Sequence, residues 1–151
     1  FPVDRLLPRF KFHRDLAAGA LLGNCLAHAT STATRPDALI PVPLHFARLR
    51  ERGYDQALEL ARMLARRHDL SLRPDLLRRT RATAPQSRLD ARARRRNLRN
   101  AFACQRLHGM PAHVVLIDDV MTTGATLHAA AHALRRAGVH RVDAWVCARV
   151  R

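Results

Sequence analysis

The chain has 151 residues, of which 48% are hydrophobic, so it is long enough for one globular domain with a substantial core. No apolar run approaches the ~20 residues that a membrane-spanning helix needs, and no secretory signal is visible, so we expect a cytoplasmic protein. The net charge of +15, carried by 26 arginines and the single lysine Lys11, predicts polyanionic partners, either nucleic acid or a phosphate-rich small molecule.

The cysteine content limits the kinds of protein that fit this sequence, and the arginine content bears on the origin of the positive charge. The three cysteines, Cys25, Cys104 and Cys147, are odd in number and far apart. This spacing argues against a disulfide framework and against a zinc site within the chain. Genome composition accounts for part of the preference for arginine over lysine, but it does not account for the sign of the net charge.

The first half of the chain predicts helices that alternate with strands. Residues 1–12 contain Pro2 and Pro8 among apolar and basic residues, and we interpret them as a short edge strand or an extended arm, because Pro8 argues against a central strand. Further elements are expected in this order: a helix over 14–29, a buried strand over 38–42, an amphipathic helix over 56–68 and a strand over 76–80.

Residues 83–100 differ in character from the segments on either side. Six arginines and one aspartate lie between positions 86 and 99, with little apolar content. Segments of this composition bury too little apolar surface to offset the entropy of ordering. We therefore expect a flexible loop over 83–100, followed by a short strand over 101–104.

The most informative stretch is 113–126. Four apolar residues, 114–117, are typical of a strand buried on both faces of a parallel sheet. Asp118 and Asp119 follow, and then a turn rich in threonine leads into a helix predicted over 125–137, with a last strand over 142–150. A strand, a polar turn and a helix start present free N–H groups and a favourable dipole to an anion.

The segment Asp118-Asp119-Val120-Met121-Thr122-Thr123-Gly124-Ala125-Thr126 resembles the phosphoribosyl pyrophosphate (PRPP) motif of type I phosphoribosyltransferases. The resemblance implies that the two acids hold the ribose hydroxyls. It also implies that the turn cradles the 5′-phosphate through Thr122, Thr123, Gly124, Ala125 and Thr126. The alternative is that Asp119 and Thr122 merely cap the turn and the helix, but a cap explains one such residue rather than the set.

A second segment narrows the resemblance. Pro41-Val42-Pro43-Leu44-His45, followed by Arg48-x-Arg50-x-Arg52-Gly53-Tyr54-Asp55-Gln56, is similar to the ComF (competence protein F) subgroup. The subgroup also resembles this chain in 84–97. By this resemblance a pyrophosphate-binding loop would include Pro43, Leu44, His45 and Arg52. The flexible loop would close over pyrophosphate and bring one or two of Arg92, Arg94, Arg95 and Arg96 to it.

The fold class expected from the alternating elements is α/β, a single domain with a mostly parallel central sheet flanked by helices. Ligands in such sheets bind beyond the carboxyl ends of the strands. The loop with Pro43, Leu44 and His45 and the segment 118–126 both begin at such strand ends. No metal site made by side chains alone is predicted. The pair His128 and His132 has metal-ligand spacing but no third ligand, and Mg²⁺ would be held mainly through PRPP.

Three functions remain open from the sequence. The resemblance implies phosphoribosyl transfer from PRPP with release of pyrophosphate. The alternatives are a PRPP-sensing module without catalysis and a competence protein that binds nucleic acid through its basic surface. The acceptor is not readable, and a hood over it would come from residues 1–12 or from residues outside the given sequence. ComF proteins often carry an amino-terminal four-cysteine zinc module, which this chain lacks, so a DNA or competence-machinery partner and a homodimer both stay open.

Overall fold

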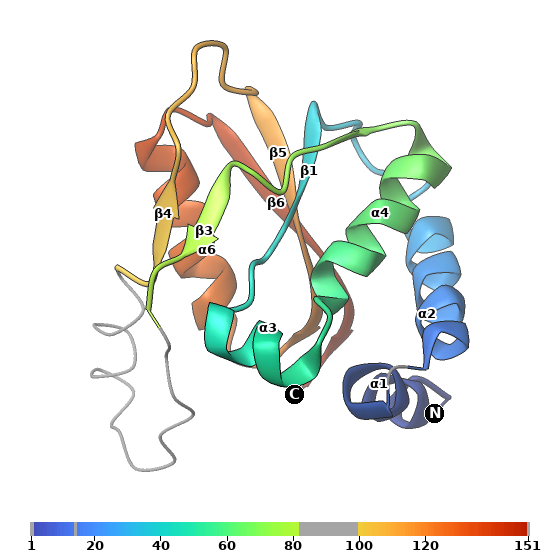
Figure 1. Ribbon diagram of the computed structural model, residues 1–151. Coiled ribbons are helices and arrows are strands. Elements are labelled where there is room, and N and C mark those ends of the chain that lie inside the picture. Colours follow the sequence, from blue (N-terminus) through green and yellow to red (C-terminus); the bar gives the residue numbers. More distant parts are fainter. Residues whose placement is uncertain (1, 14, 82–99, 151) are drawn as a thin grey trace.

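The computed structural model describes residues 2–13, 15–81 and 100–150 (Figure 1). The expected flexible loop therefore lies almost entirely outside the described residues. Along the chain the elements are α1 (Pro2–His13), α2 (Leu16–Ala29), β1 (Ala38–Pro41), α3 (Phe46–Arg52), α4 (Gln56–His68), β2 (Ser71–Leu72), β3 (Leu77–Arg79), β4 (Phe102–Cys104), β5 (His113–Met121), α6 (Ala125–Arg136) and β6 (Arg141–Arg149). None of the helices described is long and apolar enough to cross a membrane.

A four-stranded sheet in the order β2-β1-β5-β6 forms the centre of the molecule, and all its strands are parallel. A separate antiparallel pair is formed by β3 and β4. Helices α2 and α4 lie on one side of the sheet, with α1 below them, and α6 lies on the other side beside β3 and β4 (Figure 1). The predicted α/β class, with a mostly parallel sheet between helices, is confirmed.

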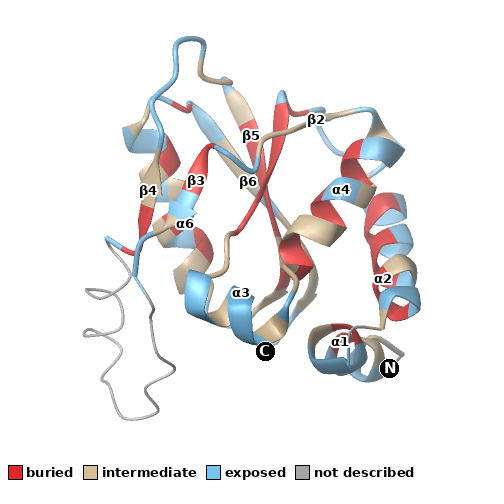
Figure 2. Cartoon of the chain, in the orientation of Figure 1, coloured by how far each residue is buried: buried red, intermediate tan, exposed pale blue. Residues whose placement is uncertain are grey.

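Two hydrophobic cores lie on the two faces of the sheet, because successive strand residues point to opposite faces. Leu39, Val115 and Ile117 pack with α1, α2 and α4, while the alternate strand residues pack with α6, β3 and β4. Figure 2 shows the buried residues along β1 and β5 and on the sides of α2 and α4 that face them. This double burial explains why β1 and β5 consist of continuous apolar runs.

The amino-terminal segment is a helix, so the prediction of an edge strand or extended arm over residues 1–12 is wrong. The apolar residues Val3, Leu6, Leu7 and Phe10 have the spacing of one helix face, and Phe10 is only 1% exposed. Pro8 is exposed and lies within the helix. A proline argues against a central strand, but on the exposed side of a short helix packed by its other face it is tolerated.

Strand β5 continues beyond the end of its neighbour β1. Pairing between them ends at Pro41 and Ile117, and the N–H of Val42 makes a last bond to the Ile117 carbonyl at 2.9 Å. Pairing with β6 continues as far as Met121. Pro43 has no N–H group to extend β1. In the described part of the chain, Asp118–Met121 (the β5 extension) is therefore bordered by a strand on one side only. The sequence predicted that the acids follow the strand, but they lie within it, because β6 continues beside them.

Candidate functional site

Asp118 and Asp119, the acid pair, lie at the carboxyl edge of the sheet, where the parallel strands end. Asp119 is only 8% exposed, and its Oδ1 accepts the N–H of Val120 at 2.8 Å. The Oδ1 of Asp118 accepts the N–H of Asp119 at 2.9 Å. Burial, reinforced by the negative charge of Asp119, raises the pKa of Asp118 to about 7. Near neutral pH Asp118 is therefore only partly ionised, unlike an ordinary surface carboxylate.

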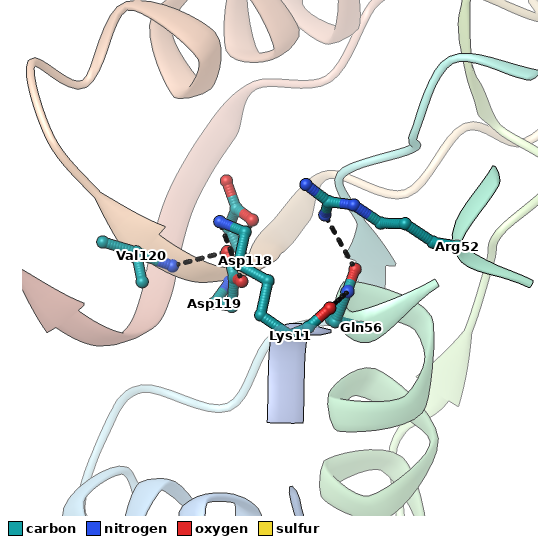
Figure 3. Close-up of polar contacts among 6 residues, drawn as sticks. All are labelled: Lys11, Arg52, Gln56, Asp118, Asp119 and Val120. Carbon is teal, nitrogen blue, oxygen red and sulfur yellow. Dashed lines mark hydrogen bonds and ion pairs between the residues drawn. The ribbon is translucent and has the colours of Figure 1, made fainter. Parts of the chain in front are cut away.

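A lysine from the other end of the chain reaches the acid pair (Figure 3). The Nζ of Lys11, in the last turn of α1, lies 3.4 Å from Oδ2 of Asp119. The carbonyl of Lys11 accepts a hydrogen bond from Nε2 of Gln56 at 3.1 Å, and Gln56 is only 2% exposed. The Nη1 of Arg52 donates to Oε1 of Gln56 at 3.4 Å. These contacts join α1, α3 and α4 around the acid pair.

The segment Thr122–Thr126 (the threonine turn) connects β5 to α6. Thr122 and Thr123 are exposed, and Gly124 has φ 74°, a left-handed conformation that favours glycine. Gly124 is the N-cap of α6 and offers no side chain to cap it, while the Thr123 hydroxyl accepts the N–H of Ala125 at 3.4 Å. The turn therefore presents hydroxyls and the amino end of a twelve-residue helix, which together suit an anion.

The loop of residues 42–45 after β1 (the β1–α3 loop) is held by bonds within the protein. His45 caps α3, because its Nδ1 accepts the N–H of Ala47 at 3.3 Å. The N–H of Leu44 points to Oδ2 of Asp55 at 3.5 Å, and the other oxygen of Asp55 accepts the N–H of Leu58 at 3.1 Å to cap α4. Burial raises the pKa of Asp55, and the charge of Asp119 raises it further. Asp55, to which the loop points its Leu44 N–H, is thus close enough to the acid pair to be affected by its charge.

The structure places most of the predicted site residues at one edge of the sheet. The acid pair and the threonine turn are consecutive there, and Arg52 points toward Gln56 beside them in Figure 3. Gly53, with φ 76°, ends α3 in a left-handed turn directly after Arg52. The four loop arginines, Arg92, Arg94, Arg95 and Arg96, lie outside the described residues. His128 and His132 are both exposed on α6, and the described residues contain no cluster of three metal-binding side chains.

Two residues at this edge were missed by the sequence analysis. Lys11 is the single lysine of the chain and lies in the last turn of α1, directly after the buried Phe10. Predicting a helix over residues 1–12 would have placed Lys11 beside the packed face of that helix. Arg79, on β3, lies over the Phe102 ring at 5.4 Å. Burial lowers the pKa of its guanidinium, the nearby Arg48 lowers it further, and Asp118 opposes both. No sequence pattern indicates that Arg79 lies close enough to Asp118 to feel its charge.

Solved structures with a similar fold include an orotate phosphoribosyltransferase and an enzyme of purine biosynthesis. Orotate phosphoribosyltransferase from Aeropyrum pernix matches with a TM-score of 0.54 and 20% identity, covering 92% of this chain and 75% of that one. An allosteric regulatory enzyme of purine biosynthesis matches with a TM-score of 0.56 and 22% identity. That match covers 83% of this chain, which spans only 24% of the larger enzyme. At these identities the likeness concerns the fold alone.

Sequence comparisons identify the family as well as the fold. Residues 108–151 match the phosphoribosyl transferase domain family. Competence protein F of Haemophilus influenzae is 37% identical, over 98% of this chain and 68% of the relative. A DNA utilization protein of Escherichia coli O157:H7 is also 37% identical, over 98% of this chain and 67% of the relative. On the strength of these matches, the chain belongs to the competence protein F (ComF) subgroup of the type I phosphoribosyltransferase family.

Proposed function

We propose that the protein binds PRPP across the acid pair and the threonine turn and transfers its phosphoribosyl group to an acceptor, with release of pyrophosphate. The observation that carries the proposal is the β5 extension. It holds one buried and one half-buried carboxylate two residues before the threonine turn and close to a helix start, at the edge of a parallel sheet where ligands bind. Family membership supports the same reaction class.

The threonine turn would bind the 5′-phosphate of the donor. The Thr122 and Thr123 side chains are exposed, and a helix start attracts negative charge through its dipole and its unpaired N–H groups. The phosphate would need no rearrangement of the sheet to reach them. Because the acid pair directly precedes the turn, a ribose ring attached to this phosphate would lie over the carboxylates.

The acid pair would orient the ribose by accepting hydrogen bonds from its hydroxyls. The transition state of such a transfer carries positive charge on the sugar, so ionised carboxylates beside it are stabilising. With the pKa of Asp118 at about 7, this carboxyl is close to half ionised before the donor arrives. A bound cationic centre would favour its ionised form.

The departing pyrophosphate needs cationic or N–H donors on the side of β1. In this proposal Arg52 supplies a guanidinium there, while Pro43, Leu44 and His45 shape the β1–α3 loop. The prediction that one or two of Arg92, Arg94, Arg95 and Arg96 close over the pyrophosphate stays a prediction, because these residues lie outside the described part of the chain.

Mg²⁺ fits this site only in part. It prefers six oxygen ligands, and it usually keeps several waters and shares one or two carboxylates with a phosphate ligand. Of the four carboxylate oxygens in the acid pair, two accept backbone N–H groups and a third faces Lys11. Asp118 is therefore the residue that would hold Mg²⁺ brought in with PRPP. When bound, the ion would neutralise charge on the leaving pyrophosphate.

One observation favours a second function, the binding of single-stranded nucleic acid. The Phe12 and Phe46 side chains are 66% and 65% exposed, with the guanidiniums of Arg52 and Arg50 over their rings at 5.8 and 5.5 Å. Exposed rings beside arginines are what unpaired bases stack on. The relatives' names, competence protein F and DNA utilization protein, agree with this second function.

Titration calorimetry with PRPP and Mg²⁺ tests the first proposal. We expect saturable binding, and an absence of any binding at millimolar PRPP would contradict it. A pyrophosphate-release assay over nucleobase acceptors then separates a transferase from a sensing module. For nucleic acid, we expect Phe12→Ala and Phe46→Ala each to weaken oligonucleotide binding by about tenfold or more, whereas the surface would be misassigned if both changes were neutral.

A further inference from the structure

A groove lies between β4 and α6 (the β4–α6 groove), on the side of the sheet opposite α2 and α4 (Figure 1). Its volume is about 400 Å³, within the range of ~300–1,000 Å³ that is usual for small-molecule sites. Its lining comes from the ends of β3 and β4, from Arg106 and from the second half of α6. The acid pair, the threonine turn and the β1–α3 loop contribute nothing to it. The groove is therefore separate from the site of the proposed function.

Small side chains leave the space between the helix and the strand. Ala133 and Ala137 lie four residues apart at the end of α6, so they share one face of it, and Ala103 lies on β4. All three line the groove and give it an apolar floor. A flat apolar group could lie on this floor without displacing any side chain of the two cores.

Strand β4 offers backbone hydrogen-bonding groups along the groove. The Ala101 carbonyl and the Gln105 N–H bond to residues beside β3, at 2.8 and 3.0 Å. Bonding alternates along an antiparallel strand, so the N–H and C=O groups of Phe102 and Cys104 point away from β3. Both residues line the groove. Because β4 has only three residues, it is too short to pair with an added peptide strand of ordinary length and suits a small molecule better.

The charge along the groove has one sign. Arg106, His132 and Arg136 line it, and none of the described residues around it is acidic. Burial raises the pKa of the Cys104 thiol, which therefore stays neutral. The carbonyl end of α6 would by itself disfavour an anion, but Nη2 of Arg106 donates to the Arg136 carbonyl at 2.7 Å and offsets this effect. That bond also holds the Arg106 guanidinium beside the last turn of α6.

We propose that the β4–α6 groove binds a mononucleotide, with its phosphate at Arg106 and Arg136 and its base on the apolar floor beside β4. Guanidinium groups make charge-assisted, often bidentate bonds to phosphate oxygens. The edge of the base would meet the backbone groups of Phe102 and Cys104. The side-chain amide of Asn100, at the other end of β4, adds a donor and an acceptor of the kind that recognises bases. The apolar floor favours a nucleotide over free phosphate.

The test is amide NMR chemical-shift mapping of the full chain, titrated separately with AMP, GMP, CMP, UMP and inorganic phosphate. We expect at least one nucleotide to shift the amides of residues 102–106 and 132–137 saturably, with a Kd below about 1 mM and at least about tenfold tighter than that of inorganic phosphate. Amides of residues 122–126 are observed separately, so binding of a nucleotide phosphate at the threonine turn is distinguished from binding in the groove.

Two substitutions and a control test the assignment. Arg136→Met should weaken binding in the groove by about tenfold or more. Arg135→Met removes the same charge from an exposed neighbour that does not line the groove, and it should change the affinity by less than about twofold. Ala133→Leu keeps every charge but fills the groove, so it should also weaken binding by about tenfold or more.

The inference is overturned if no nucleotide shifts the groove amides at millimolar concentration, or if inorganic phosphate binds there as tightly as the nucleotides. Equal losses for Arg135→Met and Arg136→Met would also overturn it, because general electrostatic attraction would then explain the binding. A short oligothymidylate that binds the groove more tightly than all four mononucleotides would assign this surface to nucleic acid instead. None of these outcomes affects PRPP binding at the acid pair, so the proposed function stands or falls separately.

Discussion

Two loops leave the carboxyl edge of the sheet, the β1–α3 loop and the threonine turn. In the first, the His45 ring caps α3 and the Leu44 N–H points to Asp55, so these polar groups are engaged within the protein. In the second, the Thr122 and Thr123 side chains are exposed, and Gly124 leaves α6 without a side-chain cap. The comparison shows exposed threonines at one loop and internally bonded polar groups at the other, so in the proposed function the β1–α3 loop must exchange internal bonds for ligand bonds or act as a rigid support.

The largest effect on PRPP affinity should come from substitutions in the acid pair, which precedes the threonine turn. We expect Asp118→Asn combined with Asp119→Asn to weaken PRPP binding by about a hundredfold, because each carboxylate loses a charge-assisted bond. The fold should stay intact, since the acids are not needed to fill either core. Calorimetry gives the affinity and circular dichroism the fold. Should the double variant unfold instead, the acids are structural and the comparison between the loops loses its functional meaning.

The pH dependence of stability should follow from Asp118. Its pKa is raised in the folded protein to about 7 from 3.8, so the folded state binds more protons than the unfolded state between these values. Stability is therefore greatest at the acid side of this window and falls as the pH rises through 7. We expect a loss of about 1.3 kcal/mol between pH 5 and pH 8, half of the ideal value in this window because the carboxyl is partly hydrated. Urea unfolding at both pH values measures it.

Asp118→Asn is the control for the pH prediction, because its amide cannot ionise. The variant should lose most of the pH dependence and be more stable than the unaltered chain at pH 8. An unchanged difference between pH 5 and pH 8 would show that other groups cause it.

The sequence predicted those elements of the fold whose pattern of apolar residues lies within one short segment. The runs at 38–42 and 114–117 are apolar because both faces of the sheet are covered, and that pattern identified the two central strands. The helix α1 was missed because Pro8 was weighed more heavily than the helical spacing of Val3, Leu6, Leu7 and Phe10. A proline disfavours a central strand, but it does not exclude a helix when it lies on the exposed face, as Pro8 does.

The site was predictable to the extent that it is contiguous. The acid pair and threonine turn occupy nine consecutive residues, so a motif could identify them. Lys11 and Arg79 reach the same edge from α1 and β3. Their approach depends on how helices and strands pack, and no periodicity encodes it. The same holds for the contacts of His45, which the sequence assigned to pyrophosphate and the structure engages in a helix cap.

A smaller loss of PRPP affinity is expected from a substitution in the threonine turn, and it tests the difference between the two loops directly. We expect Thr123→Val to weaken PRPP binding by about tenfold, because a donor to phosphate is lost. Since the side chain is exposed, the free energy of unfolding should change by less than about 0.5 kcal/mol. Thr32→Val, at an exposed position in the loop before β1, is the matched control and should change neither quantity. Equal binding by both variants would contradict the assignment of the phosphate to this turn.

The smallest effect on binding should come from the internally bonded loop. His45→Ala removes the cap of α3 and should cost about 1 kcal/mol of stability. PRPP affinity should change by about twofold at most, as for a side chain away from the ligand. Thermal unfolding and calorimetry measure the two quantities, with His132→Ala on α6 as control. A tenfold loss of affinity would show that His45 abandons its cap to reach the ligand, as the sequence had suggested.

The early end of β1 has a consequence for protein design. Pairing of β1 with β5 ends at Pro41 and Ile117, Pro43 has no N–H group to extend it, and among the described residues no strand borders the acid pair on that side. The nine-residue motif is therefore not a portable module. Grafted onto another parallel sheet, the motif would lie between two full-length strands. The second strand would then block the access of a sugar to the carboxylates. A transplant would have to carry the shortened neighbour with it.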